Sequence, residues 1–111
     1  MSNKEMAREI LKKGVLSMSK ERLIQMSHYG LPGSVVLKNP DGVISALKYQ
    51  RITFEDDANT IAFVDVDGLS QIFFNINTVT DIYGKESEDK PDYLHIFIRI
   101  GESEVIVSFQ Y

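Results

Sequence analysis

The sequence contains no cysteine, so neither disulfide bonds nor thiolate metal sites are available to it. It has only two histidines, His28 and His95, and therefore few side chains that can act as a base near neutral pH. No apolar run approaches the roughly 20 residues that a membrane-spanning helix requires. The first residues, Met1 to Glu5, lack the apolar core of a signal peptide. We therefore expect no membrane association and a cytoplasmic location.

Motifs that carry chemistry are also scarce. The segment Gly30–Gly33 is neither a dinucleotide-binding glycine motif nor a P-loop, and it precedes a predicted strand instead of a helix. The segment Asp65–Gly68 is similar to part of a calcium-binding loop, but the closing glutamate is missing. The carboxylates fall in predicted loops, where nothing raises their pKa for acid catalysis. We predict no catalytic, cofactor or metal site and no small-molecule substrate, and hence a protein that is not an enzyme.

Length and composition are those of one globular domain. The 111 residues are 43% hydrophobic and 25% charged, which is ordinary for a folded protein. A chain of this length can bury about two-thirds of its unfolded surface without disulfide bonds or structural metal ions. No internal repeat or linker divides it. We expect a single domain over residues 1–111, helical over 1–30 and built of antiparallel strands over 34–111.

Charge is distributed unevenly along the chain. Up to Lys38 there are seven basic and three acidic residues, whereas from Asn39 onward there are five basic and thirteen acidic residues. The basic segment carries the cations Lys4, Arg8, Lys12, Lys13, Lys20 and Arg22. Three interpretations stay open: the two segments have different partners, the basic arm docks on its own acidic sheet, or both segments are simply solvated.

The first thirty residues predict two short helices. Ser2 followed by Glu5 fits a capping box, and Gly14 is a plausible end for the first helix. The second helix is predicted to begin after Ser19 and to end at Gly30. Because such short helices are not stable alone, we expect both to pack on the sheet.

From Ser34 onward, apolar residues alternate with a period of two. Asn39–Gly42 suits a turn closed by a glycine at positive φ, and one long strand is predicted from Val43 towards Phe54. A loop over 55–60 follows. Residues 75–83 fit either a strand or a short helical turn, and 84–92 read as a polar loop.

The pair Asp67-Gly68, between two alternating apolar runs, is a strong hairpin signal. A two-residue turn at this pair predicts a register that extends to the preceding strand: Val66–Leu69, Phe63–Ile72, Ile61–Phe74, Phe54–Ile61 and Ile52–Phe63. A second hairpin, with Gly101–Glu104 as its loop, predicts four apolar pairs: Ile100–Val105, Ile98–Val107, Ile96–Phe109 and Leu94–Tyr111.

These patterns predict an α+β fold. Two short N-terminal helices pack on a strongly twisted, mostly antiparallel sheet of about six strands, with closure into a small barrel left open as an alternative.

The predicted ribbon is apolar on both faces, so it needs two coverings. One face is core. The other gathers apolar residues with an arginine, which is the composition of binding hot spots. The candidate partner-binding residues on this second face are Tyr49, Arg51, Val64, Val66, Leu69 and Phe73, with the acidic residues Glu55, Asp56 and Asp57 beside them. The alternative is that the two helices cover this second face, or that it lines the interior of a closed barrel.

The functional hypothesis is a small acidic interaction protein that binds another macromolecule, through a protein partner or self-association. In bulk properties it resembles phage-encoded inhibitors and toxin-immunity proteins, some of which mimic nucleic acid with acidic patches. Here the candidate patches are Glu55, Asp56, Asp57 and Asp65, and Glu86, Glu88, Asp89 and Asp92. The hypothesis covers inhibitory, immunity-like and regulatory binding by a protein that a phage or mobile element encodes. The alternatives are a nucleic-acid-binding small barrel that uses the basic helices and a virion assembly component.

Overall fold

The structure is a computed structural model that describes residues 2–28 and 31–111. Its elements in chain order are α1 (Asn3–Leu16), α2 (Lys20–Met26), β1 (Gly33–Asn39), β2 (Gly42–Tyr49), β3 (Arg51–Glu55), β4 (Thr60–Val64), β5 (Gln71–Asn75), the 3-10 turn η1 (Ile76–Thr78), β6 (Asp81–Glu86), β7 (Tyr93–Ile100) and β8 (Ser103–Gln110). None of the described helices has the length and apolar character needed to cross a membrane.

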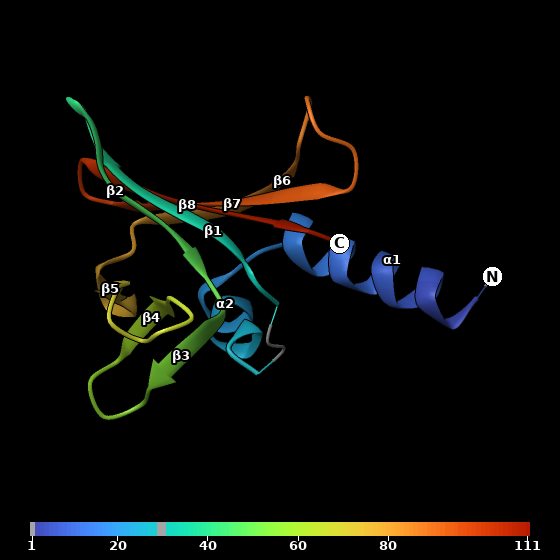
Figure 1. Cartoon of the computed structure of the whole chain (residues 1–111), viewed down its shortest axis with the longest axis horizontal. Helices are drawn as coiled ribbons and strands as arrows, with labels where there is room; N and C mark the ends of the chain where they lie inside the picture. The colour runs from blue at the N-terminus through green and yellow to red at the C-terminus, as the bar shows by residue number, and fades with distance from the viewer. Residues whose placement is uncertain (1, 29–30) are drawn as a thin grey trace.

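The strands form two antiparallel sheets that face each other. The larger sheet has the order β2-β1-β8-β7-β6, and the smaller has the order β3-β4-β5. Figure 1 shows the five-stranded sheet above the three-stranded sheet, α2 beside the smaller sheet, and α1 projecting away from both. The predicted α+β class is confirmed. The described strands number eight, not six, and they form two open sheets instead of a barrel.

The predicted long strand 43–54 is wrong because the chain bends at Gln50. This residue separates β2 in the larger sheet from β3 in the smaller one, and its N–H donates a hydrogen bond of 2.8 Å to the carbonyl of Val64. The alternation of buried and exposed side chains changes phase at the bend, because Tyr49 and Ile52 are both buried and the two residues between them are both exposed. Tyr49 therefore points into the core, while Arg51, two residues later, lies on the outside of the smaller sheet.

The register of the central hairpin is confirmed, and only its turn differs from the prediction. Phe63 pairs with Ile72, Ile61 with Phe74, Ile52 with Phe63 and Phe54 with Ile61. The ladder stops at Val64–Gln71, so Val66 and Leu69 lie in a wider loop. In this loop the N–H of Gly68 donates to the carbonyl of Asp65, and Gly68 takes the positive φ of 75° that a glycine allows.

The register predicted for the last hairpin is wrong by two residues. Ile98 pairs with Val105, and Ile100 pairs with Ser103. Gly101 adopts a φ of 61° and permits a two-residue turn, so the four-residue loop is not needed. A slip of two residues keeps every side chain on its predicted face, so the predicted core face of this hairpin is retained.

Both helices begin as predicted. The Ser2 hydroxyl accepts a hydrogen bond from the N–H of Glu5, and the Ser19 hydroxyl accepts one from the N–H of Arg22. The helix α1 does not end at Gly14 but continues to Leu16, which brings Val15 into the core. The helix α2 ends at Met26, and Gly30 lies outside the described residues.

The core lies between the two sheets and is closed at one end by α2. Fully buried side chains from both sheets meet there, and the Tyr49 and Phe63 rings pack edge to face with centroids 5.2 Å apart. The helix α2 adds Leu23 and Met26 to this core. Residues 75–83, for which the sequence allowed a strand or a helical turn, contain both the turn η1 and the start of β6. The strand β6 continues to Glu86 and so occupies the first part of the predicted polar loop 84–92.

The helix α1 is attached to the larger sheet near its C-terminal end. A Cβ added to Gly84 in β6 would stand only 1.8 Å from the carbonyl oxygen of Val15, so the helix backbone rests directly on this glycine. Further along, Arg8 pairs with Asp92 at 2.6 Å and Lys12 with Glu86 at 2.6 Å. The basic arm thus docks in part on its own acidic residues, as one of the three open interpretations of the charge asymmetry proposed.

Candidate binding surfaces

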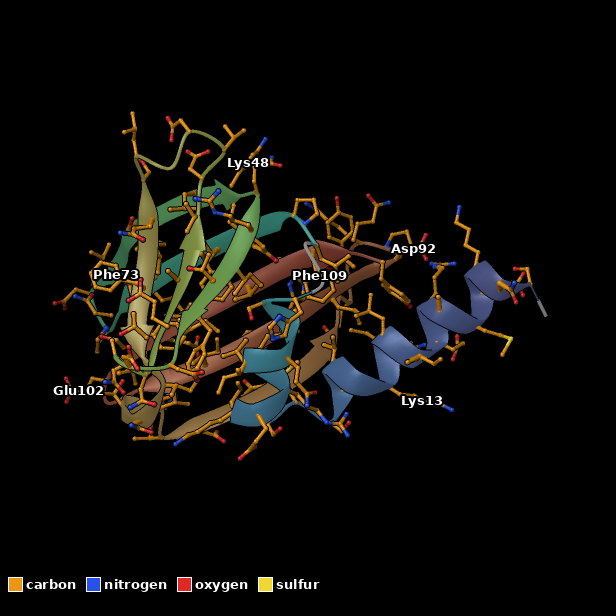
Figure 2. All side chains as sticks on the ribbon, turned by 90° about the horizontal axis from the view of Figure 1, so that it is seen from below. Lys13, Lys48, Phe73, Asp92, Glu102 and Phe109 are labelled. Atoms are coloured by element: carbon orange, nitrogen blue, oxygen red, sulfur yellow. The ribbon has the colours of Figure 1, made fainter. Side chains whose placement is uncertain are left out.

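The predicted second face is the outer face of the three-stranded sheet. Arg51 pairs with Val64 in one cross-strand row, and Ala62 pairs with Phe73 in the next. Phe73 is 62% exposed, and Figure 2, viewed from below, shows it on the outer side of this sheet. Val64 is buried beneath its neighbours. The structure therefore places Arg51, Val64 and Phe73 together, and among the apolar outer residues described in this sheet only Phe73 is widely accessible to a partner.

Tyr49 does not belong to this surface. Its side chain is fully buried against Phe63, and its hydroxyl has no hydrogen-bond partner among the described residues. Burial raises the pKa of Tyr49 far above its ordinary value, so the residue stays neutral. Its inclusion in the site was wrong, because the bend at Gln50 moves it to the core.

The remaining apolar residues, Val66 and Leu69, lie at the tip of the β4–β5 loop. Leu69 is 86% exposed, and Val66 is also largely exposed. The guanidinium group of Arg51 reaches this loop, where its Nη2 lies 3.9 Å from the position of a Cβ on Gly68. The loop is held by Asp67, whose carboxylate accepts a hydrogen bond from the N–H of Leu69 at 2.9 Å. We name Arg51, Val66, Leu69 and Phe73 the Phe73 surface.

The acidic residues do not form the patches that nucleic-acid mimicry requires. Glu55, Asp56 and Asp57 are exposed at the β3–β4 turn, whereas Asp65 lies at the opposite end of β4. In the second group, Glu86, Asp92 and Glu88 are each paired with a cation: Lys12, Arg8 and Lys85. The second patch is therefore largely neutralised within the molecule.

A larger surface lies on the outer face of the five-stranded sheet, which we call the open face. The registers align one residue from each strand into a continuous apolar row, formed by Ala46, Val36, Ile106, Phe97 and Tyr83. Tyr83 is 48% exposed, and the other four are at least partly exposed. In Figure 1 the smaller sheet and both helices lie on the other side of this sheet. No described element covers the row.

The two rows beside the apolar row differ in charge. On one side the cross-strand row carries hydrogen-bond donors and no carboxylate: Lys48, Ser34, Ser108, His95 and Lys85. On the other side, Glu104 pairs at 3.5 Å with both Lys38 and Arg99, and Asp81 lies next to Arg99. We call the first the donor row. The donor row contains no carboxylate, and its Lys85 is paired with Glu88 from outside the row, whereas the cations of the opposite row are paired within that row.

His95 lies in the part of the donor row that β7 supplies. Its Nδ1 is 2.6 Å from the hydroxyl of Ser108 on β8. Burial lowers the pKa of His95, and the nearby cations Lys85 and Lys90 lower it further, against a smaller raising effect from Asp89. The imidazole is therefore neutral near pH 7, and it acts as a hydrogen-bonding group instead of a cation.

The aromatic residues of the open face pack on each other. The rings of Tyr83 and Phe97 are stacked with centroids 5.0 Å apart and an interplanar angle of 15°. The strands that carry them are adjacent, at a spacing of about 4.8 Å. Rings stacked at that spacing stand up from the sheet and cover one another's faces. This end of the row therefore presents ring edges and the outer face of Tyr83, a shape that suits packing by apolar side chains.

One part of this surface can be read from the sequence, because Tyr93, His95, Phe97 and Arg99 occupy alternate positions of β7 and so lie on one side of the strand. Sequence reasoning missed the row itself. Each strand contributes a single residue, and only the pairing of β1 with β8 brings the five together.

The described residues contain no cluster of three or more histidine and acidic side chains arranged to hold a metal ion. The chain matches no protein-family model, and comparisons with curated proteins and with solved structures give no significant match. The surfaces themselves are thus the basis for a functional proposal.

Proposed function

We propose that this protein is a non-enzymatic binding protein that recognises a partner protein through the open face. The observation that carries the proposal is the apolar row, which crosses all five strands and which no described element covers. Antiparallel sheets commonly present one polar face to water. An apolar row with polar rows on both sides instead has the organisation of an interface, with an apolar centre and a polar rim.

The size of the row fits a protein segment. Five strands at the usual spacing span about 19 Å, which is the length of about 13 residues of helix or six residues of extended chain. The stacked pair Tyr83–Phe97 provides a rigid anchor at one end, and smaller aliphatic side chains leave room at the other. Large aromatic anchors of this kind supply most of the energy in many interfaces.

The donor row indicates the partner's chemistry. The row itself consists of two lysines, two hydroxyls and a neutral imidazole. Lys85 is already paired with Glu88, whereas Lys48 has no ion pair with a described residue. A partner that presents carboxylates or free backbone carbonyls along one edge of an apolar strip satisfies these groups. Inhibitory, immunity-like, regulatory and virion-assembly roles all require a contact of this kind, and we keep them as one class defined by binding.

The structure gives less support to nucleic-acid binding by the basic helices. Arg8 and Lys12 are already engaged by Asp92 and Glu86, so two cations of the arm are not free to bind phosphate. On the open face, Tyr83 and Phe97 cover each other instead of lying flat as base-stacking platforms. A protein partner is therefore the stronger proposal, and nucleic acid becomes an outcome of the test.

The test places a photo-cross-linking amino acid at position 83, and in a matched protein at position 73, in an extract of the source cells. The protein captured from position 83 is purified and titrated calorimetrically with the wild type, Tyr83→Lys and Phe73→Lys. We expect Tyr83→Lys to weaken binding by about tenfold or more, as for an interface anchor. Phe73→Lys, which changes a similarly exposed aromatic on the other sheet, leaves the affinity within about twofold.

Two outcomes contradict the proposal. If Phe73→Lys abolishes binding and Tyr83→Lys does not, the Phe73 surface is the binding site. If the wild type binds a labelled oligothymidine or oligouridine at physiological salt and Tyr83→Lys removes that binding, the open face takes single-stranded nucleic acid. Circular dichroism of each variant confirms that its fold is retained.

A further inference from the structure

The outward side of α1 carries three large apolar side chains that no described residue covers. Met6 is 48% exposed, Ile10 is 70% exposed and Leu16 is 46% exposed. At 100° per residue, these three fall within an arc of about 120° on the helix. The side chains that face the sheet, Leu11 and Val15, lie on the other side. The helix thus has one apolar side for its own body and another that points to solvent.

Two opposite charges lie on the same outward side. Glu9 and Lys13 are both exposed, and neither takes part in an ion pair with a described residue. Figure 2 shows Lys13 pointing away from the body. This contrasts with Arg8 and Lys12, which bind acidic residues of the loop after β6 and of β6 itself. The charges on the outward side are available to a partner.

We propose that α1 pairs with α1 of a second copy of this chain, antiparallel and across a two-fold axis near residue 11. In that arrangement the sequence is complementary to itself. Met6 lies opposite Leu16 of the second copy, and Glu9 lies opposite Lys13 of the second copy. The symmetry repeats each contact, so every pair occurs twice. Ile10 lies beside the axis and packs on its own counterpart.

The charge pattern selects this arrangement over the parallel one. In a parallel pair of helices, Glu9 meets Glu9 and Lys13 meets Lys13, which places like charges together. In the antiparallel pair, both charged positions meet their opposites. A groove of about 890 Å³ between α1 and α2 borders this outward side only at Ile10 and Lys13, and Leu11 and Val15 line its inner part, so the proposed pairing does not depend on it.

The contact is small, because a helix of 14 residues supplies less area than the roughly 800 Å² per partner of a standard interface. The dimer is therefore weak and depends on protein concentration. It supplies α1 with the tertiary packing that a short helix needs. The inference is independent of the open face, which lies on the far side of the larger sheet from α1 (Figure 1).

The first experiment is sedimentation velocity over a concentration series of the full chain. The wild type should show a rise in weight-average sedimentation coefficient towards that of a dimer. Ile10→Asp should remain a monomer at every concentration. Leu69→Asp, which charges a similarly exposed apolar residue on another part of the molecule, should associate as the wild type does.

The second experiment is a charge exchange between two variants. Glu9→Lys alone and Lys13→Glu alone each place like charges across the axis twice, so each should be monomeric. A mixture of the two variants should dimerise, because the two substituted positions then face each other with opposite charges. The native Lys13 of the first variant likewise faces the native Glu9 of the second. Circular dichroism confirms that both variants keep their helices.

Three results overturn the proposal: a wild type that is monomeric throughout the series, Ile10→Asp that still dimerises, or a mixture that stays monomeric. If Tyr83→Lys abolishes dimerisation while Ile10→Asp does not, self-association proceeds through the open face. That result would also identify a second copy as the partner in the proposed function. Retention of dimers in Tyr83→Lys keeps the two inferences separate.

Discussion

The helices α1 and α2 begin with the same serine cap, but they differ in how they use their side chains. The helix α2 buries two of its seven residues in the core, whereas α1 buries one of fourteen. The helix α2 therefore belongs to the body formed with the two sheets. The helix α1 is an arm held by Val15 on Gly84, by Leu11 against the core, and by Arg8 and Lys12, which form ion pairs, with Arg8 also over the Tyr111 ring. Local helix signals are equal in the two cases, and only tertiary packing separates them.

The comparison separates the residues that stabilise the body from those proposed to mediate self-association. Side chains of the body contribute to stability because they exclude water from one core. The arm places its outward apolar residues on a surface that the monomer does not use. Mutations should therefore affect the free energy of unfolding in the body and association in the arm.

The largest effect is expected for truncation of α2. Leu23 is fully buried, so Leu23→Ala should lower the free energy of unfolding by about 2–5 kcal/mol. Ile10→Ala in α1 should change it by less than about 0.5 kcal/mol, since the side chain is exposed. Urea denaturation at low protein concentration measures both. Equal decreases in the free energy of unfolding for Leu23→Ala and Ile10→Ala would contradict the distinction between α2 and α1.

The attachment of the arm is tested at Gly84. A methyl group there meets the carbonyl of Val15, so Gly84→Ala should displace the end of α1 and cost about 1–3 kcal/mol. Hydrogen exchange should show faster exchange of the α1 amides while β7 and β8 stay protected. If the α1 amides keep their protection in Gly84→Ala, contacts other than Val15–Gly84 are sufficient to hold α1 on the sheet.

The two serine caps provide a matched pair. Ser19→Ala should lower the free energy of unfolding by about 1 kcal/mol, because α2 unfolds with the body. Ser2→Ala removes the same hydrogen bond from the exposed end of α1 and should cost only about a few tenths of a kcal/mol globally. Urea denaturation and far-ultraviolet circular dichroism of both variants test this, and a larger loss for Ser2→Ala would contradict it.

The body also contains a buried hydroxyl whose removal should not lower the free energy of unfolding. The hydroxyl of Tyr49 is buried without a described partner, so Tyr49→Phe should leave stability unchanged or raise it by up to about 1 kcal/mol. Thermal denaturation measures the change. A clear destabilisation would show that the hydroxyl is hydrogen-bonded in solution.

The smallest effect concerns pH. The pKa of His95 is lowered in the folded protein, so the unfolded chain takes up a proton first as the pH falls below about 6.5. The contribution of His95 to stability is complete above that pH and is lost as the pH falls towards the folded pKa. His95→Gln should therefore lose less stability than the wild type between about pH 7.5 and about pH 5.5. Parallel curves for the two proteins would contradict this sign.

Much of the local structure follows from the sequence because it depends on neighbouring residues. The caps at Ser2 and Ser19 and the register from Phe54 to Phe74 are examples. In the last hairpin, a four-residue loop gave plausible apolar pairs, and the structure instead uses the glycine at 101 for a tighter turn. The faces were still correct, because a slip of two residues does not exchange them.

The division into two sheets and the open face depend on distant contacts. The sequence marks the bend only as a change of phase: apolar residues fall at 47 and 49 and then at 52 and 54, with the polar pair Gln50-Arg51 between them. This local signal does not say that the chain passes from one sheet to another. The pairing of β1 with β8 joins Val36 to Ile106, 70 positions apart in the chain. Of the candidate site residues, Tyr49 and Val64 are buried, while Arg51, Val66, Leu69, Phe73 and the three acids are exposed. Which exposed apolar surface a partner uses is decided by assembly of the whole fold.

The bend at Gln50 has a mechanical consequence. A single residue joins β2 of one sheet to β3 of the other, and its N–H is anchored on Val64. A force that separates β2 from β1 is therefore transmitted directly to the smaller sheet, because no flexible linker lies between β2 and β3. Pulled from its two ends, the body should rupture in a single event, and the arm should detach before it.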